Sequence, residues 1–174
     1  MASEETSKNR ASNPMLRPRI EKVIVNMSVG KSGEPLEKAA TVLEQLTGQK
    51  PCRRKAKKTI RDFGVRKGEP IACVVTLRKE KATEFIKRAL QAVENKVSKD
   101  SFDRFGNFSF GIEEHIDIPG TRYVPELGIH GMDVTVALSR LGQRVKHRHR
   151  SKSRVGVKHR LTREEAIEFV QGEF

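Results

Sequence analysis

Four residues between positions 113 and 117 carry groups that could do acid–base or metal chemistry: Glu113, Glu114, His115 and Asp117. Carboxylates and imidazole act in proteins as metal ligands and as proton donors or acceptors. Their spacing does not match the His-Glu-x-x-His pattern, which places two histidines on one helix face. No nucleophile, base and orienting residue stand out together elsewhere in the chain. The sequence therefore predicts an acidic surface cluster here, with neither catalysis nor a cofactor.

Two other patterns fall short of a chemical site. The stretch VGKS at 29–32 is similar to the end of a phosphate-binding loop, but that loop needs a glycine five residues before Gly30, where Val25 lies. Cys52 and Cys73 are 21 positions apart and lack the close pairing of zinc ligands. We therefore expect no nucleotide site and no metal, and reduced thiols inside the cell.

The strongest chemical signal is positive charge, concentrated in two short runs. The 174 residues carry a formal net charge of +13, with a pI near 10.1. Residues 50–67 hold nine Lys or Arg and one acidic residue, and residues 143–160 hold eight Lys or Arg and no acidic residue. Each run contributes +8, and the rest of the chain sums to −3. A solvated face explains one such run, but two on a nearly neutral body predict contact with a polyanion.

Aromatic residues are scarce in the basic runs, which contain only Phe63. Grooves that bind single strands stack bases on aromatic side chains, so such a groove is not expected. The stretch RFGNFSF at 104–110 is only partly similar to the aromatic RNA-recognition signature, because its glycine follows the aromatic residue instead of preceding it. Phe108 and Phe110 are expected in the core. Contacts with the backbone and shape of folded RNA are therefore favoured.

Hydrophobic periodicity predicts the elements that must position these residues. The predicted strands cover 19–30, the start of the first basic run, a stretch ending near 112, 71–79 and 131–140, and the predicted helices cover 34–48, 79–96 and 161–174. Thr162, with Glu165 three residues later, predicts a capping box at the start of the last helix. Residues 59–70 are expected as an exposed loop.

The short strand in the first basic run has a predicted sidedness. Cys52 and Ala56 are expected to face inward, and three cations are expected to face outward: Arg53, Lys55 and Lys57. Polar residues also occupy outward positions of two other strands, at Asn26, Thr76 and Arg78. Such side chains can simply meet water. Because positive charge enters the same sheet, a ligand surface is favoured.

The element order predicts an α+β fold of two layers. Helices pack on one face of an open, largely antiparallel sheet, and the other face is polar and binds RNA. Residues 1–17 are expected to be a flexible tail, and residues 18–174 a single domain with an extended basic arm at 143–160. The sequence contains no run of eighteen apolar residues, so no membrane span is predicted. The first residues lack the apolar segment of a secretory signal.

Four blocks of sequence resemble the 5S-rRNA-binding protein family of the large ribosomal subunit, the fifth in the universal naming. They are PRIEKVIVNMSVG, TGQKP, GEPIACVVTLR and SFDRFGNFSFGIEEHIDIP, which follow the family's order over most of residues 18–140. The ending RVKHRHRSKSRVGVKHRLTREEAIEF is similar to the archaeal branch and departs from the bacterial pattern. Bacterial contacts therefore cannot be carried onto residues 143–174.

The resemblance implies an architectural protein on the cytoplasmic large subunit, not an enzyme. Its implied partners are 5S rRNA in the central protuberance, 23S rRNA, the peptidyl-site tRNA and other central-protuberance proteins. In the family, the stretch around YVPELGIHGMD lies near the bridge to small-subunit protein thirteen.

The resemblance also implies roles for individual residues. The family's 5S-binding surface corresponds to Asn26, Gln49, Lys50, Thr76 and Arg78. The family's loop TIRDFGVRKGEP implies that four residues approach the tRNA elbow: Arg61, Phe63, Arg66 and Lys67. Cations of the basic runs are expected to neutralise rRNA phosphates, namely Arg53, Lys55, Lys57, Arg144, Lys146, Arg148 and Arg150.

Two other classes of protein fit parts of this pattern. A DNA-compacting protein would share the charge and would bind duplex DNA with little selectivity. An RNA-modifying enzyme would need a cofactor loop or an acid–base set, and the sequence offers neither. Co-sedimentation with large ribosomal subunits after a high-salt wash separates these alternatives from a ribosomal protein.

Overall fold

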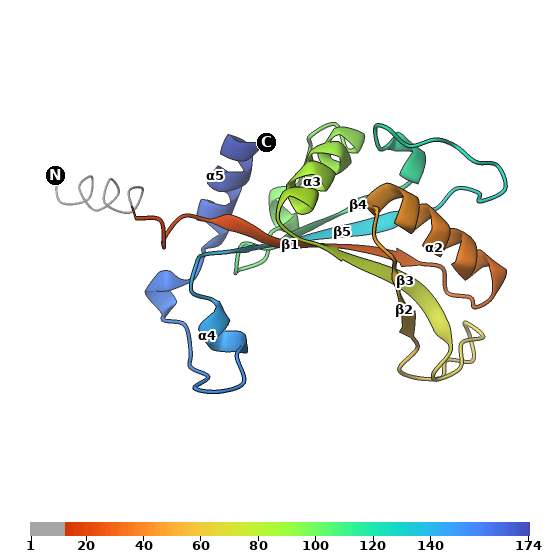
Figure 1. The fold of residues 1–174 in the computed structure, drawn as a ribbon, viewed down its shortest axis with the longest axis horizontal. Coiled ribbons are helices and arrows are strands. Elements are labelled where there is room, and N and C mark those ends of the chain that lie inside the picture. The colour runs from red at the N-terminus through yellow and green to blue at the C-terminus, as the bar shows by residue number, and fades with distance from the viewer. Residues whose placement is uncertain (1–12) are drawn as a thin grey trace. The chain divides into compact units, whose positions relative to one another are not determined.

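The computed structural model describes residues 13–174, which form an open five-stranded antiparallel sheet with four helices (Figure 1). The strands are β1 (Arg19–Ser28), β2 (Cys52–Lys55), β3 (Pro70–Leu77), β4 (Phe108–Ile112) and β5 (Met132–Ser139), and they lie in the order β2-β3-β1-β5-β4. The helices are α2 (Glu34–Thr47), α3 (Glu80–Ala92), α4 (Arg144–His147) and α5 (Arg163–Glu173). The predicted α+β class is confirmed.

The chain divides into two compact units. The sheet unit comprises Lys22–Val97 and Ser109–Thr135, and the C-terminal unit comprises Ser98–Phe108 and Val136–Phe174 together with residues 13–21. A single domain over 18–174 stays a prediction. Of the expected tail, residues 1–12 lie outside the described part, and residues 13–17 form a turn in which the Leu16 N–H donates to the Asn13 carbonyl.

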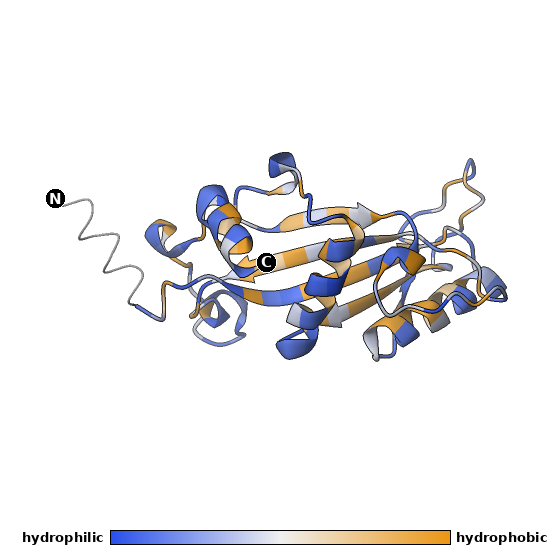
Figure 2. Ribbon diagram, turned by 90° about the horizontal axis from the view of Figure 1, so that it is seen from above, coloured by the Kyte–Doolittle hydropathy of each residue, from blue (hydrophilic) through white to orange (hydrophobic). Residues whose placement is uncertain are grey.

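The register between β1 and β3 decides which face of the sheet is buried. Antiparallel partners share a face, and the buried pairs are Val23 with Leu77, Val25 with Val75 and Met27 with Cys73. Helices α2 and α3 cover this face (Figure 1), and the Cys73 thiol lies 3.8 Å from the Leu36 carbonyl of α2. Seen from above, apolar and polar residues alternate along the strands (Figure 2). The opposite face of β1 and β3 carries Ile24, Asn26, Val74 and Thr76, and we term it the open face.

Both long helices begin where the sequence predicts, but α3 ends early. Gly48, at φ 61°, ends α2 in the left-handed conformation and donates its N–H to the Glu44 carbonyl. Helix α3 was expected to reach residue 96, and it ends at Ala92. Glu94 and Asn95 adopt φ values of 54° and 57°, and the Asn95 N–H bonds back to the Leu90 carbonyl. This turn leaves Val93 and Val97 half-buried, outside the helical face that the pattern gave them.

The predicted sidedness of β2 is wrong. Cys52 pairs with Val74 on the open face and is exposed, whereas Arg53 pairs with Cys73 and shares the helix-covered side. There the Arg53 guanidinium lies 2.5 Å from the Glu37 carboxylate of α2. A strand of four exposed residues at the sheet edge has no apolar alternation to fix its register, and a bulge between Arg54 and Lys55 shifts it again.

The C-terminal unit is held together around α5. The predicted capping box is present, with Thr162 and Glu165 exchanging side-chain-to-backbone hydrogen bonds. The buried Arg140 guanidinium lies 2.8 Å from the Glu165 carboxylate and also donates to the Arg160 carbonyl. The second basic run, expected to be an extended arm, contains the single-turn helix α4. Phe108 is buried and stacks on Phe102, while Phe110 is only half-buried.

We expect Glu165→Gln to lower the free energy of unfolding by about 2 kcal/mol at neutral pH, because Arg140 loses its charged partner in a buried position. Burial acts to raise the pKa of Glu165, but hydrogen bonds from Thr162 and Arg140 outweigh it and lower that pKa. The stabilisation is therefore complete above the ordinary carboxyl pKa and is lost as the pH falls through the lowered one. Denaturant unfolding at several pH values measures both effects. The exposed Glu164→Gln is the control, and equal stability of the two variants at neutral pH would contradict the role of the pair.

Candidate nucleic-acid interface

The open face brings together residues that the sequence predicts for RNA binding. Asn26 and Val74 are register partners, as are Ile24 and Thr76, so Asn26 and Thr76 lie on adjacent strands of one face. The Asn26 amide donates to the Ser28 hydroxyl at 3.0 Å and to the Asp133 carboxylate at 3.4 Å. Arg78 directly follows β3 and is exposed. Amide, hydroxyl and guanidinium groups are thus presented together, a mixture suited to ribose and base edges.

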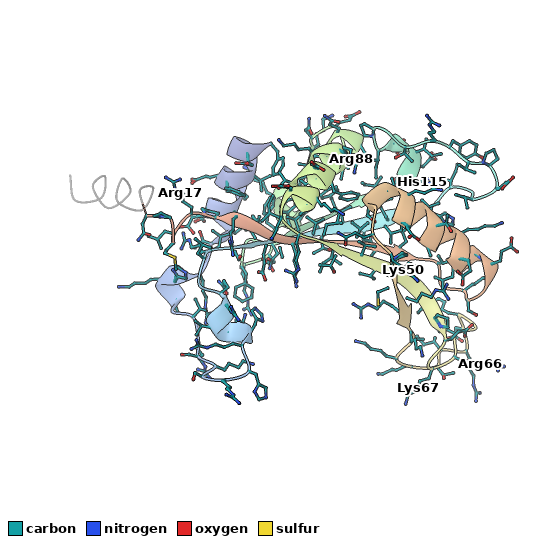
Figure 3. All side chains as sticks on the ribbon, viewed as in Figure 1. Arg17, Lys50, Arg66, Lys67, Arg88 and His115 are labelled. Atoms are coloured by element: carbon teal, nitrogen blue, oxygen red, sulfur yellow. The ribbon has the colours of Figure 1, made fainter. Side chains whose placement is uncertain are left out.

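Gln49 and Lys50 lie in the connection between α2 and β2. The Thr47 hydroxyl lies 3.4 Å from both the backbone N–H and the carbonyl of Gln49, which holds this connection next to the end of α2. Gln49 is half-buried and Lys50 is exposed, and Figure 3 shows Lys50 where the chain approaches the sheet. These two residues therefore sit beside the edge strand that carries the first basic run.

The first basic run divides between the two faces of the sheet. Arg53 is paired with Glu37 on the helix-covered side, so part of its charge is already compensated within the protein. Arg54 is the register partner of Ala72, itself the partner of Ser28, and so belongs to the open face. Arg54 cannot be singled out from the sequence, because only its pairing with β3 shows which face of the sheet it occupies. Lys55 and Lys57 are exposed beyond the bulge.

The connection between β2 and β3 is exposed, as predicted, and it has a hydrogen-bonded framework. Ile60 and Val65 exchange two backbone hydrogen bonds of 2.9 and 3.1 Å, which form a small bridge below the tip. The Glu69 carboxylate accepts the Arg66 N–H at 3.0 Å and also bonds to the Ser32 hydroxyl. The Lys67 N–H donates to the Thr59 hydroxyl at 3.0 Å. Backbone and side-chain bonds together shape this loop.

The tip of the loop displays its aromatic residue. Phe63 is 76% exposed, whereas Val65 is only 9% exposed and anchors the base of the tip. Arg61, Arg66 and Lys67 are also exposed, and Figure 3 shows Arg66 and Lys67 at the far end of the loop. An aromatic ring with no core position, flanked by cations, is suited to stacking and phosphate contacts.

The predicted cations of the second basic run lie in the C-terminal unit. Arg144 and Lys146 belong to α4, Arg148 caps its end, and Arg150 follows, all four being exposed. The Arg148 side chain donates to the Ser151 carbonyl at 2.8 Å, which closes the turn after the helix. The two basic runs thus form separate candidate surfaces, one in each unit.

Two carboxylates line a hollow of about 420 Å³ next to Asn26. They belong to Glu113 and Asp133, and Ser28 also contributes to the lining. Carboxylates repel phosphates but accept hydrogen bonds from the amino and imino groups of bases. This part of the surface therefore favours base edges over the RNA backbone. From the sequence, Glu113 is expected in a surface acidic cluster and Asp133 does not stand out, since their proximity to Asn26 depends on the pairing of strands in the sheet.

The remaining members of the 113–117 cluster separate in space. His115 is buried at 3% exposure, while Glu114 and Asp117 are exposed. Burial and the nearby His130 lower the pKa of His115. Within residues 13–174, no group of three His, Cys, Asp or Glu side chains could hold a metal ion. In the same part of the chain, no helix is long and apolar enough to span a membrane.

We expect Glu69→Gln to loosen the β2–β3 loop. Hydrogen bonds from Ser32 and from the Arg66 N–H lower the pKa of Glu69. The contribution of Glu69 to the order of the loop is therefore complete at pH values above the ordinary carboxyl pKa, and it is lost as the pH falls through the lowered pKa. Backbone ¹⁵N order parameters of residues 61–67 should fall in the variant at neutral pH, and in the wild type on acidification. Asp62→Asn in the same loop is the matched control. Order parameters that stay equal in wild type and Glu69→Gln would contradict the framework.

Two family models together match almost the whole described chain. The model described as "Ribosomal protein L5" matches residues 13–66, and a second model, which describes the C-terminus of the same ribosomal family, matches residues 70–169. The chain is 58% identical over 159 residues to "Large ribosomal subunit protein uL5" of Pyrobaculum aerophilum, covering 91% of this chain and 89% of the relative. It is 49% identical over 174 residues to the protein of the same name from Sulfolobus acidocaldarius, covering 100% of this chain and 96% of the relative.

Proposed function

The chain belongs to the ribosomal protein L5 family, and we propose that this structural protein of the large ribosomal subunit holds 5S rRNA on the open face of its sheet. Members of the family are structural proteins of cytoplasmic ribosomes and not enzymes. The relatives of this chain named above are archaeal. The observation that carries the proposal is the β1–β3 register, which puts Asn26 and Thr76 at diagonal positions of adjacent strands, on a face that α2 and α3 leave uncovered.

Binding to 5S rRNA would combine two kinds of contact. Arg54, Lys50 and Arg78 neutralise phosphates, which gives affinity and a steep dependence on salt. Asn26, Gln49 and Thr76 hydrogen-bond to ribose and to base edges exposed in a non-helical loop of the RNA. The carboxylates beside Asn26 accept hydrogen bonds from amino groups of a base. The exposed cations of the second basic run, including Arg144 and Lys146, supply a separate contact with 23S rRNA.

The β2–β3 loop is proposed to contact the peptidyl-site tRNA. Its support is the exposure of Phe63 at a tip flanked by Arg61, Arg66 and Lys67. Stacking and phosphate contacts suit a partner that arrives and leaves, because neither needs a large buried interface.

The 123–133 segment is proposed to face small-subunit protein thirteen and other proteins of the central protuberance. The support for this proposal is that Tyr123 and Ile129 expose large side chains, at 53% and 52%, which a protein partner would bury.

The register predicts different effects for two neighbouring arginines. Arg54→Ala should weaken 5S rRNA binding by about tenfold, the value of one charge-assisted contact, whereas Arg53→Ala should have a smaller effect because Glu37 already neutralises that side chain. Asn26→Ala combined with Arg78→Ala should weaken binding by about tenfold or more. Filter binding across a salt titration, with a control RNA of equal length, measures the affinities. Equal affinity for both RNAs at every salt concentration, or for duplex DNA, would contradict specific 5S recognition.

Phe63→Ala is expected to reduce crosslinking to tRNA in reconstituted ribosomes and to leave 5S rRNA binding unchanged. The lost stacking is worth about 1–3 kcal/mol per base. Phe105→Ala removes another exposed ring, one that lies in the C-terminal unit, and serves as the control. Loss of 5S binding in Phe63→Ala would contradict the assignment of the loop and the open face to different RNAs.

A further inference from the structure

A second hollow, of about 220 Å³, lies on the helix-covered side of the sheet unit. It is lined by α2, by Arg88 of α3 and by the segment from His115 to Arg122, and we term it the Arg88 hollow. Figure 3 shows Arg88 and His115 on the side of the sheet where the helices pack. A water molecule occupies about 30 Å³ in the liquid, so a larger group fits. None of the residues proposed for 5S rRNA or tRNA binding contributes to its lining.

An unsatisfied hydroxyl group marks the wall of this hollow. The Thr121 hydroxyl oxygen is buried and has no hydrogen-bond partner in the described part of the chain. Buried polar groups in native proteins nearly always have a partner, because leaving one unpaired is costly. The oxygen itself has almost no accessible surface, so a ligand with an oxygen acceptor would satisfy this group after the Thr121 side chain rotates toward the hollow.

His115 offers a second donor with a fixed tautomer. Its Nδ1 accepts the His130 N–H at 3.3 Å, so in the neutral ring the proton resides on Nε2. Burial keeps the ring neutral by lowering its pKa, and the neighbouring His130 adds to this effect. The His115 side chain therefore presents an N–H group without competing as an acceptor at that atom.

Two arginines provide positive charge. The Arg88 guanidinium is held in place by the Leu46 carbonyl at 3.3 Å and by the Phe85 ring, whose centroid is 5.9 Å away, which leaves other N–H groups available. Arg122 is exposed at the mouth and makes no hydrogen bond or ion pair with the described residues. No acidic residue is found among the described residues that line the hollow.

We propose that the Arg88 hollow binds a phosphate group through Arg88, Arg122, the Thr121 hydroxyl and the His115 Nε2–H. Converging donors with two guanidinium groups and no carboxylate match the oxygens and charge of phosphate. The phosphate belongs either to an RNA backbone, as a diester, or to a free nucleotide, as a monoester. Because the hollow shares no residue with the open face, an experiment can contradict phosphate binding in the hollow without contradicting 5S rRNA binding on the open face, and the reverse.

NMR titration of the full-length protein tests the proposal. The probes are inorganic phosphate, adenosine monophosphate and the dinucleotide ApA, which contains one diester and no monoester, with acetate as a carboxylate control. Saturable shifts are expected at the Thr121 and Arg122 amides and the His115 ring. Shifts with ApA assign the site to an RNA backbone, and shifts only with inorganic phosphate and adenosine monophosphate assign it to a free phosphate or nucleotide. Equal shifts with acetate, or none with any phosphate probe, would overturn the proposal.

Two variants locate the binding. Thr121→Val and Arg122→Gln should each weaken phosphate binding by about tenfold, the value of one hydrogen bond to a charged group. Neither should lower the melting temperature, since Thr121 loses an unpaired hydroxyl and Arg122 has no hydrogen bond or ion pair with the described residues to lose. Lys87→Gln, an exposed charge on α3 outside the lining, is the matched control. Equal phosphate affinities in the wild type, the two variants and the Lys87→Gln control would contradict the site. Asn26→Ala should leave the phosphate titration unchanged, which separates this result from that of the 5S experiments.

Discussion

The antiparallel pairing of β1 with β3 in one register is the constraint on which the sheet unit depends. It turns Val23, Val25 and Leu77 toward α2 and α3, and burial of each such side chain contributes about 1.5–3 kcal/mol. A slip of one residue would exchange the two faces of the slipped strand and expose the core. The same register therefore also fixes Asn26 and Thr76 on the opposite face. Hydrophobic packing thus determines on which face the polar groups lie, and no additional interaction is needed to orient them.

Positively charged residues are concentrated in the segments of the sheet unit that take little part in this packing. The edge strand β2 and its loop bury little apolar surface, so they can carry cations that no core could accommodate. Charged residues on an edge strand also discourage pairing with another sheet, which is a risk for any unpaired edge. Arg53 is the exception, because it turns back to Glu37 and binds the edge to α2. Its neighbour Arg54 has no such partner within residues 13–174 and adds to the field that a polyanion meets.

The local features of this fold could be predicted from the sequence, and the non-local ones could not. The order of elements, the buried face of β1 and the Thr162 capping box follow from periodicity and short motifs. The side of Arg54 depends on pairing with β3, and the Arg88 hollow depends on α2, α3 and residues near 120 meeting in space. The apolar periodicity does not predict the early end of α3, because Val93 and Val97 continue the helical pattern. A turn at Glu94 and Asn95 overrides that pattern.

The open face and the β2–β3 loop differ in how firmly their side chains are held. Side chains on strands are held by the sheet and by core packing, so Asn26 and Thr76 would lose little conformational freedom on binding an RNA. The loop instead depends on a two-residue bridge and on the Glu69 carboxylate, which constrain its backbone without burying its tip. Such a framework would limit the entropy lost on binding and leaves the side chains of Phe63 and the cations free to move. Within the first basic run, the boundary between side chains held on the sheet and side chains on the adaptable loop therefore lies where β2 ends.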